Sequence, residues 1–516
     1  MNDVPPDRPL FIGLDLGTSS LKAVALGAGG EVAARAHARY ATDRPEPWAA
    51  EQDPHDWWAA VEAAVAQLRD GGAPAARWAA VGLSGMIPTL VVTDGDGEPV
   101  VPAITWEDGR AEPFGDALRE RLGPDHLYAR TGQWVDGRYL LPMFERLGRV
   151  APEALERARW LLGAKDWLVW RLTGEPATDP STATGFGCFG LESGDWLYDV
   201  LDVAGGGLPL PSLPGVWPSE SALRLSGEAA ARLGLPAGLP VAVGAADSVL
   251  GCLGLGVTSP GQVAYVAGTS TVVLGVADRL VLDDHHRYLV TPLAGTPGWG
   301  FEMDQLATGS AVRWLAGLLG EARGDEGRLM AMAAGVEPGA GGLSFLPFVA
   351  PGEQGALWDP ALSGTVIGLS LSHGQAQVAR ALVDGIVLES RRCLDVLEQA
   401  GLPRGDVNVA GGSGADPVFR QQLADASRRR VVYAGDGETA HSAIGAALLA
   451  MAATTRTAGP SMRRTQGPVV TSLEVLEPRA SESARWDELW DRHEQALASI
   501  RTASPGARSD TGGEQA

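Results

Sequence analysis

The sequence has very little lysine, little cysteine and no long apolar run. Among 516 residues there are two lysines and three cysteines, and the cysteines (Cys188, Cys252 and Cys393) are far apart. Without a Cys-x-x-Cys pair we expect neither a disulfide framework nor a zinc site, but buried thiols in a reducing cytoplasm. No segment approaches the roughly 20 apolar residues of a membrane span, and the polar N-terminus does not resemble a secretion signal.

Positive charge is scarce relative to negative charge. Lys and Arg total 41 against 63 Asp and Glu, which gives a formal net charge of −22. Nucleic acids and anionic membranes attract clustered Lys and Arg, so the sequence predicts neither as a partner. At this length, and with 45% hydrophobic residues, we expect a soluble chain of two domains with separate cores.

What the sequence does contain is one short pattern that occurs twice. An apolar run leads into Gly17-Thr18-Ser19, and half a chain later residues 263–267 lead into Gly268-Thr269-Ser270; a second apolar run follows each turn. Both segments are typical of hairpins whose tips present backbone N–H groups and small hydroxyls to anionic oxygens. One such turn would usually be only a turn. The paired occurrence in the same order favours two phosphate-binding hairpins.

The two copies differ in one carboxylate. Asp15 stands just before the first turn, whereas Val266 occupies the corresponding position in the second. Since carboxylates beside phosphates bind Mg²⁺, we predict that Asp15 holds this ion through water. Lys22 follows the first turn and is a candidate phosphate contact, with a solvent-facing Lys22 as the alternative.

A third feature is a carboxylate at the end of an apolar strand. Asp247 follows the small residues 241–246 and precedes a glycine-rich segment. Ligands of α/β folds bind at the carboxyl ends of strands, so Asp247 is a candidate base that orients and deprotonates a substrate hydroxyl. The alternative is a helix N-cap, and the residues alone do not separate the two interpretations.

These motifs resemble the FGGY carbohydrate kinases, within the superfamily of sugar kinases, actin and Hsp70 ATPases. The resemblance covers most of the chain and is closest to xylulokinase-like members. It implies an α/β fold of two actin-like (ribonuclease H-like) domains with ATP and sugar bound in a cleft between them. It also implies ATP and Mg²⁺ as cofactors, a small-molecule sugar substrate, and Asp15 and Asp247 as catalytic residues.

The resemblance extends to the adenosine end of the nucleotide. Gly411-Gly412-Ser413 follows the apolar strand 407–410, as in the adenosine loop of the family. It implies that Gly412 and Asp416 contact the nucleotide, although Asp is less usual there than Asn. Gly309 is similar to a family position that lines the nucleotide site. The expected phosphate contacts are Gly17, Thr18, Ser19, Lys22, Gly268, Thr269 and Ser270.

The predicted sugar pocket departs from the xylulokinase pattern. Met86-Ile87-Pro88 stands where xylulokinases carry Met-His-Gly, so an apolar, rigid pair replaces a polar contact to the sugar. Met143 and Gln354 replace a Lys and an Arg of the family patterns. We therefore expect a ketopentose or a related sugar or polyol, with D-xylulose a poor substrate. The predicted substrate-binding residues are Met86, Ile87, Pro88, Trp106, Asp108 and Asp247.

Three alternatives stay open at this point. Trp106 is either a sugar-stacking residue or a plain core tryptophan. The chain as a whole is either a kinase, a catalytically weak sugar and ATP sensor, or a non-kinase actin-like ATPase switch. A homodimer is an open possibility for its assembly.

The motifs also divide the chain. We expect an N-terminal domain over 9–255 with the sugar site and the first hairpin, and a C-terminal domain over 256–455 with the second hairpin and adenosine site. An extension over 456–501 should end in a docked helix, followed by a disordered tail, 502–516. Helices are predicted over 54–67, 303–319, 376–399, 441–453 and 481–500.

Overall fold

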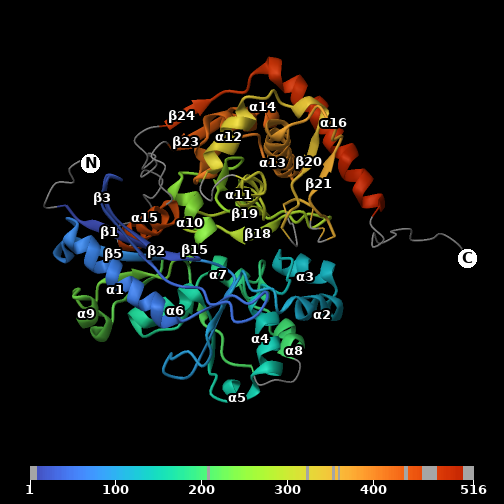
Figure 1. Ribbon diagram of the computed structural model, residues 1–516. Helices are drawn as coiled ribbons and strands as arrows, with labels where there is room; N and C mark the ends of the chain where they lie inside the picture. Colours follow the sequence, from blue (N-terminus) through green and yellow to red (C-terminus); the bar gives the residue numbers. More distant parts are fainter. Residues whose placement is uncertain are drawn as a thin grey trace, which may run out of the picture.

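The structure is a computed structural model that describes residues 8–205, 210–320, 325–350, 355–357, 359, 361–434, 440–455 and 473–503. Two α/β domains lie one above the other in Figure 1, the N-terminal one in blue to green and the C-terminal one in green to red. Each is built around a seven-stranded sheet. Gln354 and the residues predicted as a tail from 504 onward lie outside the described residues.

The sheet of the N-terminal domain contains the first hairpin. Its strand order is β13-β14-β5-β1-β2-β3, and β15 pairs with β5. Every residue of β1 is buried, because this central strand is covered on both faces. The bounds are β1 (Leu10–Leu16), β2 (Ser20–Gly27), β3 (Val32–Arg39), β5 (Trp78–Gly85), β13 (Ala222–Arg224), β14 (Pro240–Ala242) and β15 (Ala245–Ala246).

The sheet of the C-terminal domain follows the same plan. Its order is β18-β19-β17-β16-β22-β23-β24. In both sheets the first hairpin strand pairs antiparallel with the second and parallel with a later strand. The second hairpin strand also pairs antiparallel with a further strand, β3 in the first sheet and β19 in the second. The repeated sequence pattern is therefore a repeated fold. The bounds are β16 (Val263–Ala267), β17 (Thr271–Ala277), β18 (Leu289–Pro292), β19 (Trp299–Gln305), β22 (Val407–Ala410), β23 (Val431–Ala434) and β24 (Leu473–Leu476).

Smaller elements complete the N-terminal domain. A four-stranded sheet has the order β4-β7-β6-β8. Helix α1 (Pro54–Asp70) begins where Asp53 accepts a hydrogen bond from the His55 amide, and it buries Trp57 and Val61 against the first sheet. The other bounds are β4 (Glu51–Gln52), β6 (Thr89–Thr93), β7 (Ala103–Thr105), β8 (Trp160–Gly163), α2 (Glu112–Leu122), α3 (Pro124–Thr131), α4 (Leu140–Val150), α5 (Pro152–Leu155), α6 (Ala164–Thr173), α7 (Pro180–Thr184), α8 (Tyr198–Gly205), α9 (Gly227–Leu233) and α10 (Asp247–Gly254).

The C-terminal domain contributes one helix to the opposite sheet. Helix α15 (His441–Thr455) packs on β1 and β5 of the N-terminal domain. The approach is so close that a Cβ on Gly13 would lie 1.8 Å from the Ala443 carbonyl oxygen, and one on Gly82 2.0 Å from that of Ala446. The segment predicted as the C-terminal domain, 256–455, therefore ends in a helix that ties the two domains together.

The predicted helices are present with shifted bounds. The one expected over 303–319 begins only at Gly309, because Met303 lies in β19 with its side chain buried in the sheet. The others match α1, α13, α15 and α16. The remaining bounds are α11 (Gly309–Leu318), α12 (Glu326–Ala334), α13 (Gln375–Gln399), α14 (Pro417–Ser427), α16 (Ala480–Ala503), β20 (Ser344–Leu346) and β21 (Thr365–Ile367).

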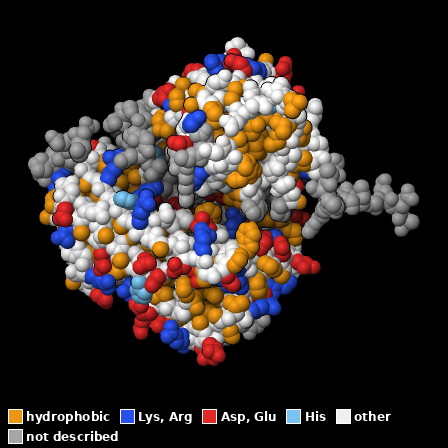
Figure 2. All heavy atoms as spheres, in the orientation of Figure 1, with side chains coloured by type: hydrophobic (Ala, Val, Ile, Leu, Met, Phe, Trp, Pro, Cys, Tyr) orange, Lys and Arg blue, Asp and Glu red, His pale blue; other side chains and the backbone are white. Residues whose placement is uncertain are grey.

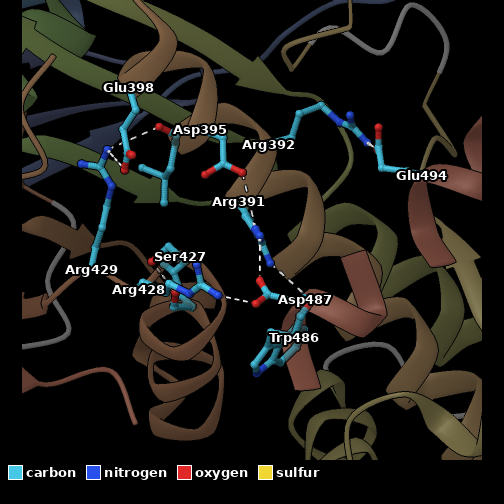
Figure 3. A network of polar contacts seen from close by, with 12 residues as sticks. Arg391, Arg392, Asp395, Glu398, Ser427, Arg428, Arg429, Trp486, Asp487 and Glu494 are labelled. Atoms are coloured by element: carbon cyan, nitrogen blue, oxygen red, sulfur yellow. Dashed lines mark hydrogen bonds and ion pairs between the residues drawn. The ribbon is translucent and has the colours of Figure 1, made fainter. Parts of the chain in front are cut away.

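The last helix, α16, docks on the C-terminal domain as expected. Its own Trp486 and Leu497 side chains are buried against that domain, and ion pairs lie around Trp486 (Figure 3). Arg391 of α13 pairs with Asp487 of α16 at 3.0 Å, and Arg392 pairs with Glu494. No described helix has the length and apolar character to cross a membrane.

Candidate functional site

Both Gly-Thr-Ser segments form the predicted hairpin tips. In the first, the Gly17 amide donates to the Ser20 carbonyl at 3.2 Å; in the second, the Gly268 amide donates to the Ser270 carbonyl at 2.8 Å. The tips reach the surface, with Ser19 and Thr269 exposed. Their amides and hydroxyls can therefore receive an anionic ligand.

Asp15 is a buried carboxylate near the tip of the first hairpin. It lies opposite Lys22 in the hairpin and beside Ser84 of β5, whose hydroxyl donates to it at 2.8 Å. Burial raises the pKa of Asp15, against the opposing effects of the Lys22 charge and the Ser84 hydrogen bond. A cation bound beside this carboxylate would offset the energetic cost of burying its negative charge.

Asp247 and Asp15 lie at the same end of the sheet, where strands β1, β5 and β15 finish. Strand β15 pairs with Ser84 and Gly85 of β5, and Asp247 follows it as the first residue of α10. The N-cap position of α10 is Ala246, so the N-cap alternative for Asp247 is wrong. Burial, the charge of Asp15 and that of Asp304 raise the pKa of Asp247 to about 7.

Two carboxylates of the opposite domain face Asp247. The Ser248 hydroxyl donates to Glu302 of β19 at 2.9 Å, and burial together with Asp304 and Asp247 raises the pKa of Glu302. Burial raises the pKa of Asp304 to about 6, although the Arg138 charge opposes this shift. Sequence reasoning missed Glu302 and Asp304. Their i, i+2 spacing places them on one face of a strand, but this signal was hidden by the helix predicted there.

Two further residues near the hairpins were also missed. The Tyr40 hydroxyl donates to the Gly17 carbonyl, and burial with the charges of Asp15 and Asp247 raises the pKa of Tyr40. Arg138 lies before α4, where its guanidinium donates to Asp136 at 2.6 Å. Neither residue belongs to a short motif, so only the fold brings them to the site.

The predicted sugar-pocket segment continues directly from β5. The Met86 amide donates to the Leu16 carbonyl at 2.9 Å, and the Met86 side chain is buried. Ile87 packs against the apolar cluster of Ala246 and Val249, at the start of the helix that carries Asp247. Ile87 therefore packs on the helix that carries Asp247, and the contact of Ile87 and Pro88 with a sugar stays a prediction.

Trp106 and Asp108 have well-defined partners. The Trp106 indole donates to the Thr18 hydroxyl at 3.1 Å, so Trp106 touches the tip of the first hairpin. Asp108 is buried, accepts from the Ala50 amide at 2.9 Å and forms an ion pair with Arg110 at 2.7 Å. Its carboxylate already holds a loop of the protein, and its predicted contact with the sugar stays a prediction.

The second hairpin is surrounded by the predicted adenosine residues. Gly309 begins α11 so close to the hairpin that a Cβ would lie 2.3 Å from the Gly268 carbonyl oxygen and 2.6 Å from the Ser413 hydroxyl. Gly412 is exposed with open space around it. Asp416 is the N-cap of α14 and accepts from the Phe419 amide at 2.8 Å, so its contact with a nucleotide stays a prediction.

Comparison with known proteins agrees with this geometry. The FGGY carbohydrate kinase N-terminal domain matches residues 10–254, and the C-terminal domain of that family matches residues 263–454. The chain belongs to the FGGY family of carbohydrate kinases. It is therefore an ATP-dependent kinase, and the enzymes of this family use ATP with Mg²⁺.

Relatives of this kinase are named for different substrates. It is 27% identical to a gluconokinase of Bacillus subtilis, over 86% of this chain and 87% of the relative. It is 33% identical to a glycerol kinase of Trichlorobacter lovleyi, over 85% and 89%. The crystal structure of a xylulose kinase from Rhodospirillum rubrum superimposes with a TM-score of 0.85 at 28% identity, covering 96% of this chain and 99% of that one. The family is clear, and the sugar is not.

The residues present fit Mg²⁺ and ATP. Among the described residues no group of three or more His, Cys, Asp or Glu side chains could hold a metal alone. A single buried carboxylate, Asp15, suits an ion that keeps its waters and takes further ligands from phosphates. The missing Cβ of Gly309 leaves the second hairpin room to lie against α11.

Proposed function

We propose that this kinase phosphorylates a hydroxyl of a small sugar, a ketopentose or a related sugar or polyol, with Asp247 as the base. The observation that carries the proposal is the position of Asp247, which is separated from Asp15 by one strand, β5. Its pKa is raised to about 7. A base with a pKa near the working pH accepts a proton efficiently and is still ionised in a large fraction of molecules.

Each residue has a defined part in the proposed transfer. Asp247 accepts the proton of the sugar hydroxyl. The oxygen of that hydroxyl bonds to the terminal phosphorus of ATP, and the bond from this phosphorus to the leaving ADP oxygen breaks. The two hairpins hold the phosphates, and Asp15 holds Mg²⁺, which when bound neutralises phosphate charge. The negative charge of Asp304, like that of Asp15, raises the pKa of the base, and Glu302 and Asp304 accept hydrogen bonds from further hydroxyls.

The substrate prediction rests on Ile87 and Pro88. Proline has neither a side-chain donor nor a backbone N–H, and isoleucine has no polar side-chain atom. A buried sugar hydroxyl left unpaired beside them would cost about 1–3 kcal/mol, roughly a tenfold to hundredfold loss in affinity. We therefore propose that D-xylulose is a poor substrate and that the preferred sugar has no hydroxyl requiring a partner there.

A coupled ADP-release assay across pentuloses, hexuloses, polyols and sugar acids tests this function. Sugar-dependent ADP release with at least one compound is the expected result. ADP release independent of sugar would instead indicate an ATPase switch, and sugar binding without ADP release a sensor. If D-xylulose had the highest kcat/KM of the panel, the substrate proposal would be wrong.

Two properties of the whole protein belong to the same proposal. The three cysteines are free and buried, which suits a cytoplasmic enzyme. A homodimer is the assembly that we propose to test, by light scattering of the purified protein.

A further inference from the structure

We propose that a buried ionic cluster, Lys165 with Asp166 and Asp179, positions residues 243–246, the segment that leads directly into Asp247, acting through Ser181. The proposal rests on the function proposed above, since it concerns the support of the same base. All four side chains are buried and none is among the predicted binding residues, so they are positioning residues rather than catalytic ones.

The cluster is fully buried and closely bonded. Lys165, Asp166 and Asp179 have no exposed surface. The Lys165 ammonium lies 2.9 Å from Asp166 Oδ1 and 3.4 Å from Asp179 Oδ1. Two carboxylates against one ammonium leave a net negative charge in the interior, which is expensive unless every oxygen has a partner.

Two direct contacts join this cluster to residues 243–246, the segment before Asp247. The Lys165 ammonium donates to the Val243 carbonyl at 3.1 Å. The Ser181 hydroxyl donates to Asp179 Oδ2 at 2.5 Å and accepts from the Ala246 amide at 3.0 Å. The amide directly before Asp247 is therefore bonded to a hydroxyl whose orientation is fixed by a buried carboxylate.

Asp179 is itself anchored independently of the strand. It is the N-cap of α7, accepts from the Ser181 amide at 3.0 Å, and accepts from the Thr182 hydroxyl at 2.6 Å. The Ser219 hydroxyl donates to it at 3.1 Å. A carboxylate held at this many points transmits its position to Ser181, and a displacement of about 1 Å at a reacting group can lower turnover about a hundredfold.

The chain offers a matched pair of variants for the test. Ser181→Ala removes the hydroxyl that bridges Asp179 and the Ala246 amide. Thr182→Val removes a hydroxyl of the same helix that bonds the other carboxylate oxygen, Asp179 Oδ1, which the Lys165 ammonium also holds. This hydroxyl has no hydrogen bond to residues 243–246, and its loss leaves the contacts of Oδ2 with Ser181 and Ser219 in place. Ser181 and Thr182 are equally buried, so the pair separates positioning from general loss of stability.

The experiment measures sugar-dependent ADP release against pH in both variants, with ATP affinity followed by titration. We expect Ser181→Ala to lower kcat about tenfold to hundredfold with ATP affinity unchanged. We also expect its acidic limb to move to lower pH, because a displaced Asp247 is more hydrated and its pKa falls. Thr182→Val should retain kcat within about twofold and keep the limb in place.

A double variant distinguishes this proposal from the function on which it rests. In an Asp247→Asn background, Ser181→Ala should have no further effect, because the group it positions is gone. Suppose that Asp247→Asn lowers turnover as predicted. If Ser181→Ala alone then behaves like Thr182→Val, only the positioning role is wrong. The same conclusion follows if Ser181→Ala lowers the residual turnover of Asp247→Asn still further. Near-normal turnover in Asp247→Asn would overturn both the base and its support.

Should Ser181→Ala fail to fold, Ser219→Ala removes a different hydrogen bond to the same Asp179 oxygen. The proposal then requires a smaller shift of the acidic limb in the same direction. An unchanged limb in a folded Ser219→Ala protein would contradict it.

Discussion

The two hairpins have one backbone plan and different supports. Side chains hold the first: the Tyr40 hydroxyl donates to the Gly17 carbonyl, the Trp106 indole to the Thr18 hydroxyl, and the Gln52 amide to the Thr18 carbonyl at 2.7 Å. The start of α11 and one side chain hold the second: the Ser310 amide donates to the Thr269 carbonyl at 2.9 Å, and the Ser413 hydroxyl donates to the Gly268 carbonyl at 3.2 Å. The repeat supplied two similar turns, and their surroundings made them different.

The two hairpins also differ in the chemical groups that they offer to a ligand. The first has a buried carboxylate, Asp15, on its entry strand, and the second has Val266 there. The first is therefore suited to a metal and to the reacting phosphate, and the second to close docking of the nucleotide. The following predictions test this division, from the largest expected effect to the smallest.

The largest effect should come from the carboxylate that only the first hairpin has. Asp15→Ala should lower Mg²⁺-dependent turnover at least about a hundredfold, because no acid in the second copy can replace it. Val266→Ala, at the corresponding position, should change turnover by less than about threefold. A Mg²⁺ titration of both variants measures this, and unchanged metal affinity and rate in Asp15→Ala would exclude the role.

The second hairpin should respond to a single methyl group. In Gly309→Ala the new Cβ would lie 2.3 Å from the Gly268 carbonyl oxygen, so the hairpin or α11 must shift. We expect the KM for ATP to rise about tenfold to hundredfold. Gly317→Ala in the same helix meets open space and should leave KM unchanged. Equal KM values for the two variants would remove the argument for close docking.

A smaller effect is expected from the support of the first hairpin. Trp106→Phe keeps the ring but loses the indole donor to Thr18, a hydrogen bond worth about 0.5–1.5 kcal/mol. Turnover should therefore fall roughly twofold to tenfold. Trp160→Phe, in the same apolar cluster, provides the control. If the two variants were equally active, Trp106 would be only a core residue.

The smallest effect concerns the charge facing Asp247. Removing the like charge of Asp304 favours the ionised form of Asp247, so in Asp304→Asn the pKa of Asp247 should fall. Activity needs ionised Asp247, so the acidic limb of kcat/KM, near pH 7, should move to lower pH by roughly half a pH unit. Asp56→Asn, at an exposed position of α1, should not move it. A shift to higher pH would contradict the sign.

The sequence predicted the parts of the site that lie within short motifs. The hairpins, Asp15 and Asp247 follow strands with clear apolar runs, so local pattern placed them at a sheet edge. It failed for Glu302 and Asp304, because the helix predicted over 303–319 covered the end of β19, and without that strand nothing placed Glu302 and Asp304 on one face. Tyr40, Arg138 and the cluster of Lys165 depend on contacts between segments far apart in the chain, which no local pattern records.

Asp247 is the residue on which the proposed phosphoryl transfer depends most directly. The decisive measurement is kcat for sugar-dependent ADP release in Asp247→Asn, with ATP affinity determined on the same protein. We predict unchanged ATP affinity and a kcat lowered by roughly two to four orders of magnitude, because Asn cannot accept the proton. Near-normal kcat with the best sugar would contradict the assignment of the base.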